Sequence, residues 1–276
     1  RSGSRNFSAE KYLRPMKIKI LYEDKNILAI DKPSGILVHS DQKGGKETLQ
    51  DIFLKKFPKL ELVHRLDRET SGVILFAKNK KAHEFLKKQF MGRTIRKVYN
   101  AIVVGSVKND HGVINKPIGR SPVDFRRRLA GRGARGTLRE AITEYKVLKR
   151  FKASTLSKFL SLRPQAGPSG VKISKVSTPA KFTFLEIKPK TGRTHQIRVH
   201  MKYLNHPVAC DSLYNPKGSC PIPPPNLPLA KGEERGRGIT RLMLHAKSIE
   251  FKNLKGKTIK VESPLPREFK KYFKIL

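Results

Sequence analysis

Acidic side chains are scarce in this sequence of 276 residues, which holds 22 Asp and Glu against 60 Lys and Arg. The formal net charge is therefore +38, whereas a net charge of about 2–8 is enough to keep a small domain soluble. Such an excess would strain a compact fold through self-repulsion unless a polyanion offsets it. The scarcity of acids thus predicts an anionic partner: RNA, DNA or an anionic membrane.

Long apolar runs are also missing. No stretch approaches the ~20 apolar residues of a membrane span, and no signal-peptide core lies near the first residue. We therefore expect no membrane association, and nucleic acid becomes the leading partner, with a merely basic surface as the alternative. The two cysteines, Cys210 and Cys220, fit neither a disulfide framework nor a zinc pattern, which predicts a reducing, cytoplasmic location.

Several motifs of cofactor and nucleophile chemistry are absent. There is no Walker A sequence, no GxGxxG that follows a strand and opens a helix, and no GxSxG elbow. His195 and His200 share one predicted helix, but they do not form the HExxH pair of a zinc protease. We therefore expect no nucleotide cofactor, no metal and no serine nucleophile, and for these histidines we expect RNA contacts or core packing.

The hydrophobic pattern predicts many strands and few helices, without regular βαβ alternation. This order favours an α+β fold with a mixed, mostly antiparallel sheet and flanking helices, formed by one domain over residues 17–276 after a flexible basic arm at 1–16. Helices are expected at Thr48–Leu54, Lys80–Phe90, His195–Leu204 (capped by Thr194) and Pro266–Phe273. Strands are expected at Lys17–Tyr22, Ile27–Ile30, Ile36–His39, Val73–Phe76, Lys97–Val104, Ala141–Leu148, Lys181–Ile187, Arg241–Ala246 and Lys247–Phe251.

Three polar segments interrupt this pattern and are predicted to be long, partly disordered loops. Arg126–Arg139 carries six arginines and three glycines, and we favour RNA contact for it because guanidinium groups bind phosphate and stack on bases. Lys152–Pro179 has no periodic pattern. Asn215–Thr240 contains a proline run, and we interpret it as a neutral insertion.

One stretch, His64–Gly72, places the single carboxylate Asp67 between Arg65 and Arg68, directly before an apolar run. A local ion pair on a surface loop is one interpretation. The other is catalytic: surrounding cations would hold Asp67 ionised, and an ionised, positioned carboxylate is a competent nucleophile toward a sugar C1′. Uracil is a tolerable leaving group, so such a reaction would not need a second acid.

Four stretches resemble, in order, the motifs of RluA-type pseudouridine synthases, a family that modifies ribosomal and transfer RNA. They are Ile27–Gly35, His64–Gly72, Arg96–Ala101 and Gly192–His200, the last followed by His206-Pro207-Val208 and Asp211–Tyr214. Leu244-His245-Ala246 resembles the closing strand, so the resemblance covers roughly Ile18 to Phe273. Several long motifs in one order are far more specific than any single motif.

The resemblance implies roles for individual residues. Asp67 would be the essential aspartate, acting at C1′ or removing a proton from C2′, while Arg198 would pair with it. Tyr99 would stack on the target base and assist removal of the C5 proton, and Arg65 would fill the gap left by the flipped uridine. Further contacts to RNA or to the uridine are expected from His64, Arg68, Thr70, Arg193, His195, Gln196, Ile197 and Leu244. The resemblance also implies a central RNA-binding cleft across the middle of the mixed sheet, and neither a metal nor a cofactor.

The implied substrate is a uridine in structured RNA, with large-subunit ribosomal RNA as the leading target and transfer RNA as the alternative. Many relatives carry an N-terminal S4 RNA-binding domain, and the stretch before Lys17 is too short for one. We expect a monomer. A non-catalytic RNA-binding or ribosome-assembly protein, and an N-glycosylase that releases free uracil, are the competing interpretations.

Overall fold

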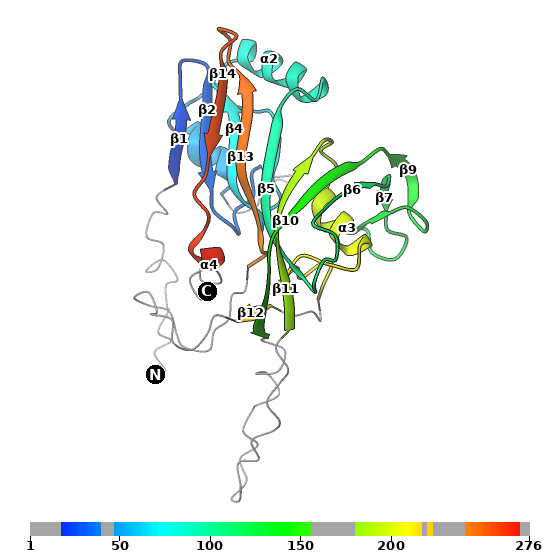
Figure 1. The fold of residues 1–276 in the computed structure, drawn as a ribbon. Coiled ribbons are helices and arrows are strands. Elements are labelled where there is room, and N and C mark those ends of the chain that lie inside the picture. Colours follow the sequence, from blue (N-terminus) through cyan, green and yellow to red (C-terminus); the bar gives the residue numbers. More distant parts are fainter. Residues whose placement is uncertain (1–17, 40–46, 156–179, 217–219, 223–240, 271–276) are drawn as a thin grey trace, which may run out of the picture.

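A computed structural model describes residues 18–39, 47–155, 180–216, 220–222 and 241–270. It shows the predicted α+β architecture, in which a long, twisted sheet carries a helix on each face of its N-terminal half and a smaller three-stranded sheet at the other side (Figure 1). The helices are α1 (Leu49–Leu54), α2 (Lys80–Met91), α3 (Gln196–Tyr203) and α4 (Arg267–Lys270). None of the described helices is both long and apolar enough to cross a membrane.

The main sheet has 11 strands within the described residues, along the path β1-β2-β4-β13-β5-β11-β10-β12. All its pairs are antiparallel except the short parallel contact between β4 and β13, which confirms a mixed, mostly antiparallel sheet. Its strands are β1 (Lys19–Glu23), β2 (Ile27–Lys32), β3 (Glu61–Leu62), β4 (Ser71–Ala77), β5 (Arg96–Val104), β6 (His111–Asn115), β10 (Ile142–Thr155), β11 (Ala180–Pro189), β12 (Pro221–Ile222), β13 (Leu244–Lys252) and β14 (Thr258–Glu262).

Strand β4 is buried on both of its faces, which explains why it appears in the sequence as a continuous apolar run. Val73 and Leu75 pack with the buried residues of α2 on one face. Ile74 and Phe76 point to the opposite face and pack with those of α1. Because the loop that carries Asp67 leads directly into β4, this two-sided core fixes the end of that loop.

Helices α1 and α2 begin where their capping residues predict. The Thr48 side chain accepts a hydrogen bond from the Asp51 amide at 3.3 Å, and the Asp51 carboxylate accepts from the Thr48 amide at 2.9 Å, which completes a capping box. At α2 the Asn79 side chain accepts from the Ala82 amide at 2.9 Å. The prediction for the last helix is correct at Arg267–Lys270, and residues 271–273 lie outside the described residues.

The closing strands are predicted as two, but the structure forms one, β13. Its register with β5 shifts between Ala246 and Ser248, so a bulge interrupts the alternation of buried and exposed side chains. Along its other edge β13 pairs first with β4 and then with β14. It therefore lies between β4, which follows the loop of Asp67, and β5, which carries Tyr99.

The strand predicted at Ile36–His39 is wrong. After the turn at Gly35, the carbonyl groups of Leu37 and Val38 accept hydrogen bonds from the first amides of α1, at 2.8 and 3.0 Å. Backbone groups used in this way are not available to a sheet neighbour. The segment instead packs Val38 against the core beneath α1.

The Arg/Gly segment 126–139 is also not a structureless loop. It contributes β8 (Arg128–Ala130) and β9 (Arg135–Arg139), which pair with β7 (Ile118–Arg120) on either side to form the three-stranded sheet. Backbone hydrogen bonds order this segment despite its few apolar side chains. The six arginines and three glycines of this segment therefore indicated its exposure correctly, but the prediction that it is a partly disordered loop is wrong.

The remaining insertions fall largely outside the described residues, as does the arm predicted at residues 1–16. Residues 156–179 and 223–240 belong to this group, whereas Lys152 continues β10. Cys210 and Cys220 form a disulfide, with their Cα atoms 4.8 Å apart. The expectation of unpaired cysteines is wrong, and the argument for a reducing compartment loses its basis.

Gly72 lies at the contact between β4 and β13, with φ +111°. A Cβ atom there would overlap the carbonyl oxygen of Ala246 and lie 2.7 Å from its carbonyl carbon. We expect Gly72→Ala to lower the free energy of unfolding by about 3 kcal/mol or more, measured by urea denaturation. Gly35→Ala is the matched control, because Gly35 has φ +94° but open space around a Cβ, and we expect a loss of about 1–2 kcal/mol. Equal losses would show that backbone strain, and not the clash, is the cause.

Candidate active site

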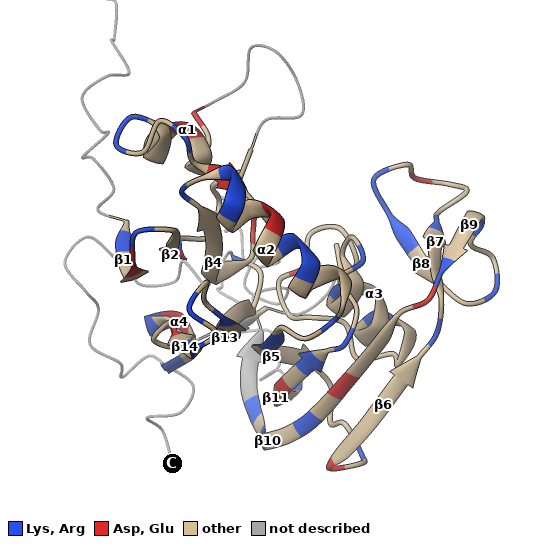
Figure 2. Cartoon of the chain, turned by 90° about the horizontal axis from the view of Figure 1, so that it is seen from above, with Lys and Arg blue, Asp and Glu red and all other residues tan. Residues whose placement is uncertain are grey.

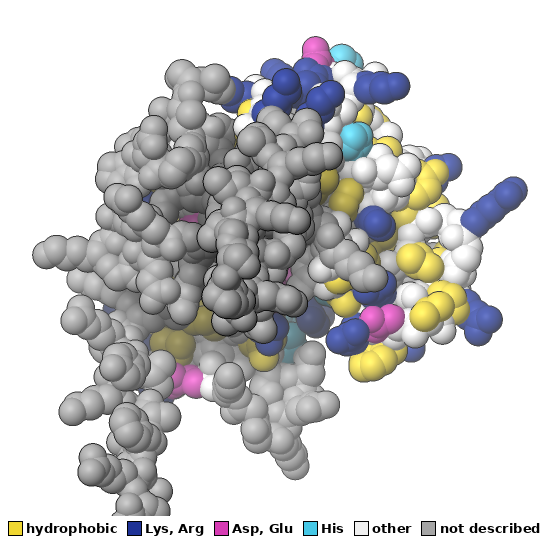
Figure 3. All heavy atoms as spheres, turned by 90° about the horizontal axis from the view of Figure 1, so that it is seen from below, with side chains coloured by type: hydrophobic (Ala, Val, Ile, Leu, Met, Phe, Trp, Pro, Cys, Tyr) yellow, Lys and Arg dark blue, Asp and Glu magenta, His cyan; other side chains and the backbone are white. Residues whose placement is uncertain are grey.

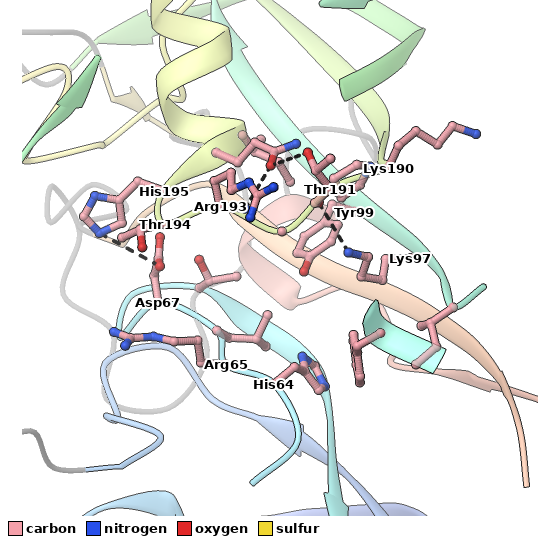
Figure 4. A pocket seen from close by; sticks show the side chains of 18 of the residues that line it. His64, Arg65, Asp67, Lys97, Tyr99, Lys190, Thr191, Arg193, Thr194 and His195 are labelled. Carbon is pink, nitrogen blue, oxygen red and sulfur yellow. Dashed lines mark hydrogen bonds and ion pairs between the residues drawn. The ribbon is translucent and has the colours of Figure 1, made fainter. Parts of the chain in front are cut away.

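A cavity of about 500 Å³ opens where the loop before β4, strand β5 and the start of α3 meet (Figure 4). Eleven of the twelve residues that the sequence assigns to the site line it: His64, Arg65, Asp67, Thr70, Tyr99, Arg193, His195, Gln196, Ile197, Arg198 and Leu244. The exception is Arg68, whose Nε donates to the neighbouring Glu69 carboxylate at 2.8 Å while its side chain is largely exposed.

The loop of Asp67 is fastened from behind by Lys32. This lysine is fully buried, and its Nζ donates to the carbonyl oxygens of Arg68 and Thr70 at 2.8 Å each, and of Pro33 at 3.0 Å. Burial lowers the pKa of Lys32 to about 7, although the charge of Asp67 acts in the opposite direction. Because three carbonyl groups converge on one amine, the backbone that presents Asp67 has a single well-defined path.

Arg198 connects two carboxylates across the cavity wall. Its Nη1 lies 3.2 Å from Asp67 Oδ2, while its Nε and Nη2 donate to Asp211 at 2.7 and 2.8 Å. Burial alone would lower the pKa of Arg198, but the hydrogen bonds and charge of Asp211, together with Asp67, raise it above its ordinary value. Arg198 therefore points a fixed positive charge at Asp67.

Asp211 is itself held in place. It is almost completely buried, and its Oδ1 also accepts the backbone amides of Leu213 and Tyr214 at 3.0 and 2.9 Å. A buried carboxylate that accepts several hydrogen bonds keeps its orientation. Asp211 thus fixes the position of the Arg198 guanidinium, which does not depend on the hydrogen bond to Asp67.

Tyr99 and Lys97 are on one face of β5 and form the opposite wall (Figure 4). Burial, followed by the nearby charge of Asp67, raises the pKa of Tyr99, so its side chain is a neutral phenol near pH 7. Burial lowers the pKa of Lys97 to about 8. Its Nζ lies 3.4 Å from the Thr191 carbonyl, and among the described residues it has no ion pair.

His195 adopts a left-handed backbone conformation, with φ 56°, at the residue before α3. The predicted cap by Thr194 is wrong: His195 occupies the cap position of α3, and no side-chain capping hydrogen bond is formed there. His195 Nδ1 lies 2.9 Å from the Tyr214 hydroxyl, and its Nε2 lies 3.9 Å from Asp67 Oδ1. The left-handed turn therefore directs the imidazole at Asp67.

Several predicted contact residues use their polar groups within the protein. Gln196 accepts from Thr191 and Arg193 and donates to Ile142 and Thr143, which ties α3 to β10. His64 Nε2 accepts the Leu75 amide at 2.9 Å, its ring packs on Phe90, and burial lowers its pKa to about 3. These two residues shape the cavity, and the structure leaves no donor or acceptor of Gln196 for a ligand.

His200 faces away from the cavity. Its ring nitrogens contact Thr143 Oγ1 at 2.8 Å and the Lys116 carbonyl at 3.0 Å, so core packing is the correct choice of its two predicted roles. No group of three or more His, Cys, Asp or Glu within the described residues is arranged to hold a metal ion.

Comparison with known proteins shows which family this chain belongs to. The sequence profile described as RNA pseudouridylate synthase matches residues 26–203, which include Asp67, Tyr99 and Arg198. The chain belongs to the RNA pseudouridylate synthase family. Ribosomal large subunit pseudouridine synthase D of Pseudomonas aeruginosa is 33% identical over 261 residues, with 92% of this chain and 70% of that protein covered. An uncharacterised RNA pseudouridine synthase of Aquifex aeolicus is 37% identical, with 73% of this chain but 57% of that protein covered.

Solved structures of the RNA pseudouridylate synthase family have the same fold. The human RNA pseudouridylate synthase domain containing 1 matches with a TM-score of 0.63 and 25% identity, covering 90% of this chain and 84% of that one. The human domain containing 4 protein matches with a TM-score of 0.63 and 27% identity, covering 92% and 91%. The predicted family and fold are therefore confirmed.

For this pseudouridylate synthase family member, sequence reasoning assigned no role to four residues that build the site. Lys97, Asp211 and Tyr214 lie inside the stretches that carry the resemblance. Their partners Thr191, Arg198 and His195 are 94, 13 and 19 residues away in the chain, so the contacts depend on the tertiary fold. Lys32 could have been suspected, because it is a charged residue at the end of an apolar strand and directly before a proline. Asp211 carried a weaker signal as one of only 22 acidic residues.

Proposed function

We propose that this protein isomerises uridine to pseudouridine in structured RNA, with Asp67 as the catalytic carboxylate. The observation that carries the proposal is the position of Asp67: Oδ2 is bound by Arg198, while Oδ1 faces the cavity with no hydrogen bond from the described residues. A carboxylate with one fixed and one accessible oxygen is suited to attack or deprotonate a substrate.

In the proposed reaction the glycosidic bond between N1 and C1′ breaks, and N1 departs with the bonding electrons. The uracil rotates, C5 bonds to C1′, the C5 proton passes to solvent and N1 gains a proton. A carboxylate at this place can act on C1′ as a nucleophile or on the C2′ proton as a base. Both routes conserve atoms and need no cofactor.

Tyr99 is proposed to stack on the target uracil, since its ring forms part of the wall opposite Asp67. Its raised pKa favours the neutral phenol before substrate binds. Assistance in removing the C5 proton therefore starts from a phenol, which must first give up its own proton. Leu244 and Ile197, both nearly buried, would complete the apolar wall around the base.

The three-stranded sheet is proposed as an additional RNA contact. Arginines are exposed along it, including Arg120, Arg132 and Arg135, and Figure 2 shows basic residues on β8 and along α2. Two apolar side chains, Val123 and Phe125, are 93% and 85% exposed on the turn between β7 and β8. On the described part of the face in Figure 3, Lys and Arg side chains outnumber acidic ones. Guanidinium groups beside an exposed aromatic ring suit phosphates and unstacked bases.

Large-subunit ribosomal RNA is the proposed target. The support is the similarity to relatives that are named ribosomal large subunit pseudouridine synthase D and C, at 33% and 34% identity. We also propose that the protein acts as a monomer, because the described residues of one chain already bring Asp67, Tyr99 and Arg198 to one cavity.

Release of tritium tests the proposal directly. Large-subunit ribosomal RNA transcribed with [5-³H]uridine should release tritium to water when the protein is added, and mapping should find pseudouridine at discrete positions. Transfer RNA labelled in the same way is the parallel substrate. Binding without release would support a non-catalytic RNA-binding protein instead, and release of free uracil would support an N-glycosylase.

A further inference from the structure

His195 has a role that can be derived from its hydrogen bonds. The Tyr214 hydroxyl oxygen accepts the backbone N–H of Arg128 at 2.9 Å and lies 2.9 Å from His195 Nδ1. Among the described residues, His195 Nδ1 is the only acceptor for the hydroxyl hydrogen of Tyr214. Tyr214 therefore donates to Nδ1, and a neutral imidazole that accepts at Nδ1 carries its hydrogen on Nε2.

The N–H at Nε2 has no acceptor among the residues that the structure describes. It faces Asp67 Oδ1 (Figure 4), but the 3.9 Å between the two heavy atoms is too long for a hydrogen bond. Burial lowers the pKa of His195, against the opposing charge of Asp67, which supports the neutral form. A donor and a carboxylate oxygen thus face each other across a gap that one substrate oxygen, in reach of both, would bridge.

The bridging atom must accept from Nε2–H and donate to Oδ1, so it is a hydroxyl. This inference rests on the proposed function, in which Asp67 acts at C1′ or C2′ of the target nucleotide. The 2′-hydroxyl is bonded to C2′ and can both accept and donate. The ring oxygen of the ribose accepts only and would leave Oδ1 without a partner.

We propose that His195 binds the 2′-hydroxyl of the target uridine, in the tautomer set by Tyr214, and so selects ribose over deoxyribose at that nucleotide. Arg198 occupies the other oxygen of Asp67 and cannot make this contact. The selection therefore depends on two residues: His195, whose Nε2 faces Asp67 Oδ1, and Tyr214, whose hydroxyl sets the tautomer of His195.

Affinity measurements with matched RNAs test the contact. The RNA is a large-subunit ribosomal fragment from which the wild-type chain releases tritium, and for binding it is prepared with pseudouridine already at the target, so that Asp67 keeps its carboxylate and turnover does not interfere. One RNA has a single 2′-deoxy substitution at the target nucleotide, and the control RNA has it at the next nucleotide. We expect about 5- to 10-fold tighter binding of ribose than of deoxyribose at the target, the scale of one hydrogen bond, and no such difference at the neighbour.

The variants separate the hydrogen bond from the fold. His195→Asn tolerates the left-handed backbone but cannot reach the gap, and it should reduce the preference to within about twofold. His195→Gln, whose amide reaches as far as Nε2, should restore it. Tyr214→Phe should give an intermediate preference because both tautomers become accessible. Melting temperatures confirm that each variant folds.

Two failures are distinguishable. An unchanged preference for ribose in His195→Asn, on an RNA that does release tritium with the wild-type chain, overturns the role of His195 and leaves the proposed function intact. Absence of tritium release from every ribosomal and transfer RNA tested overturns the proposed function, and the inference with it.

Discussion

Asp67→Asn should reduce the rate of tritium release by about 10⁴-fold or more, while the protein stays folded and still binds RNA. An amide has the shape of the carboxylate but is neither a nucleophile nor a base toward ribose. The fold should persist because Arg198 keeps its two hydrogen bonds to Asp211 when the charge of Asp67 is removed. Single-turnover kinetics and filter binding measure the two properties separately.

Glu69→Gln is the matched control. Glu69 lies two residues from Asp67 and pairs with the exposed Arg68 outside the cavity, so its variant should retain near wild-type turnover. If Asp67→Asn keeps more than about one hundredth of the wild-type rate, the carboxylate is not the essential catalytic group. If the variant loses RNA binding as well, the measured rate would not report on chemistry.

Asp211→Asn should both destabilise the protein and impair turnover, although Asp211 does not line the cavity. The amide replaces an acceptor with a donor against the Arg198 guanidinium, which would remain buried with Asp67 as its single charge partner. Breaking a buried ion pair costs about 3–5 kcal/mol. We expect a loss of that size in urea denaturation, and a fall in kcat of about 10²-fold, as for a lost electrostatic donor.

Asp110→Asn provides the comparison for Asp211→Asn. Asp110 also pairs with an arginine, Arg150, but its side chain is 76% exposed. Surface pairs contribute less than about 1 kcal/mol because water screens them. Equal losses in the free energy of unfolding for the two variants would mean that burial does not strengthen the contribution of Asp211 to stability. An unchanged kcat in Asp211→Asn would mean that catalysis does not depend on the orientation that Asp211 gives to Arg198.

Local patterns in the sequence predicted much of the fold. The apolar run at Val73–Phe76 indicated a buried strand, and Thr48 stands at the start of the capped helix that it predicted. The placement of Asp67 before a buried strand and of Tyr99 within one could also be predicted. These features depend on residues close together in the chain, which is why sequence alone reveals them.

Features that depend on distant partners could not be predicted in this way. The Arg198–Asp211 pair, the Lys32 contacts to the Asp67 loop and the Tyr214–His195 hydrogen bond all require the tertiary fold. The cap of α3 was mispredicted because His195, in a left-handed conformation that the sequence pattern does not reveal, occupies the cap position in place of Thr194. The bulge in β13 divided one strand into two apparent ones, since it breaks the period of two.

The position of β13 has a consequence for synthesis of the chain. Asp67 precedes β4, whereas Tyr99 and Arg198 belong to β5 and α3, and β4 and β5 are joined through β13 between them. Translation at about 5–20 residues per second delivers Leu244–Lys252 roughly 10–40 s after the Asp67 loop. Until that strand leaves the ribosome, no strand connects β4 with β5. The loop that carries Asp67 and the strand that carries Tyr99 therefore belong to two parts of the sheet that are not yet joined. Catalytic competence is therefore among the last properties that a nascent chain acquires, long after its basic segments can meet RNA.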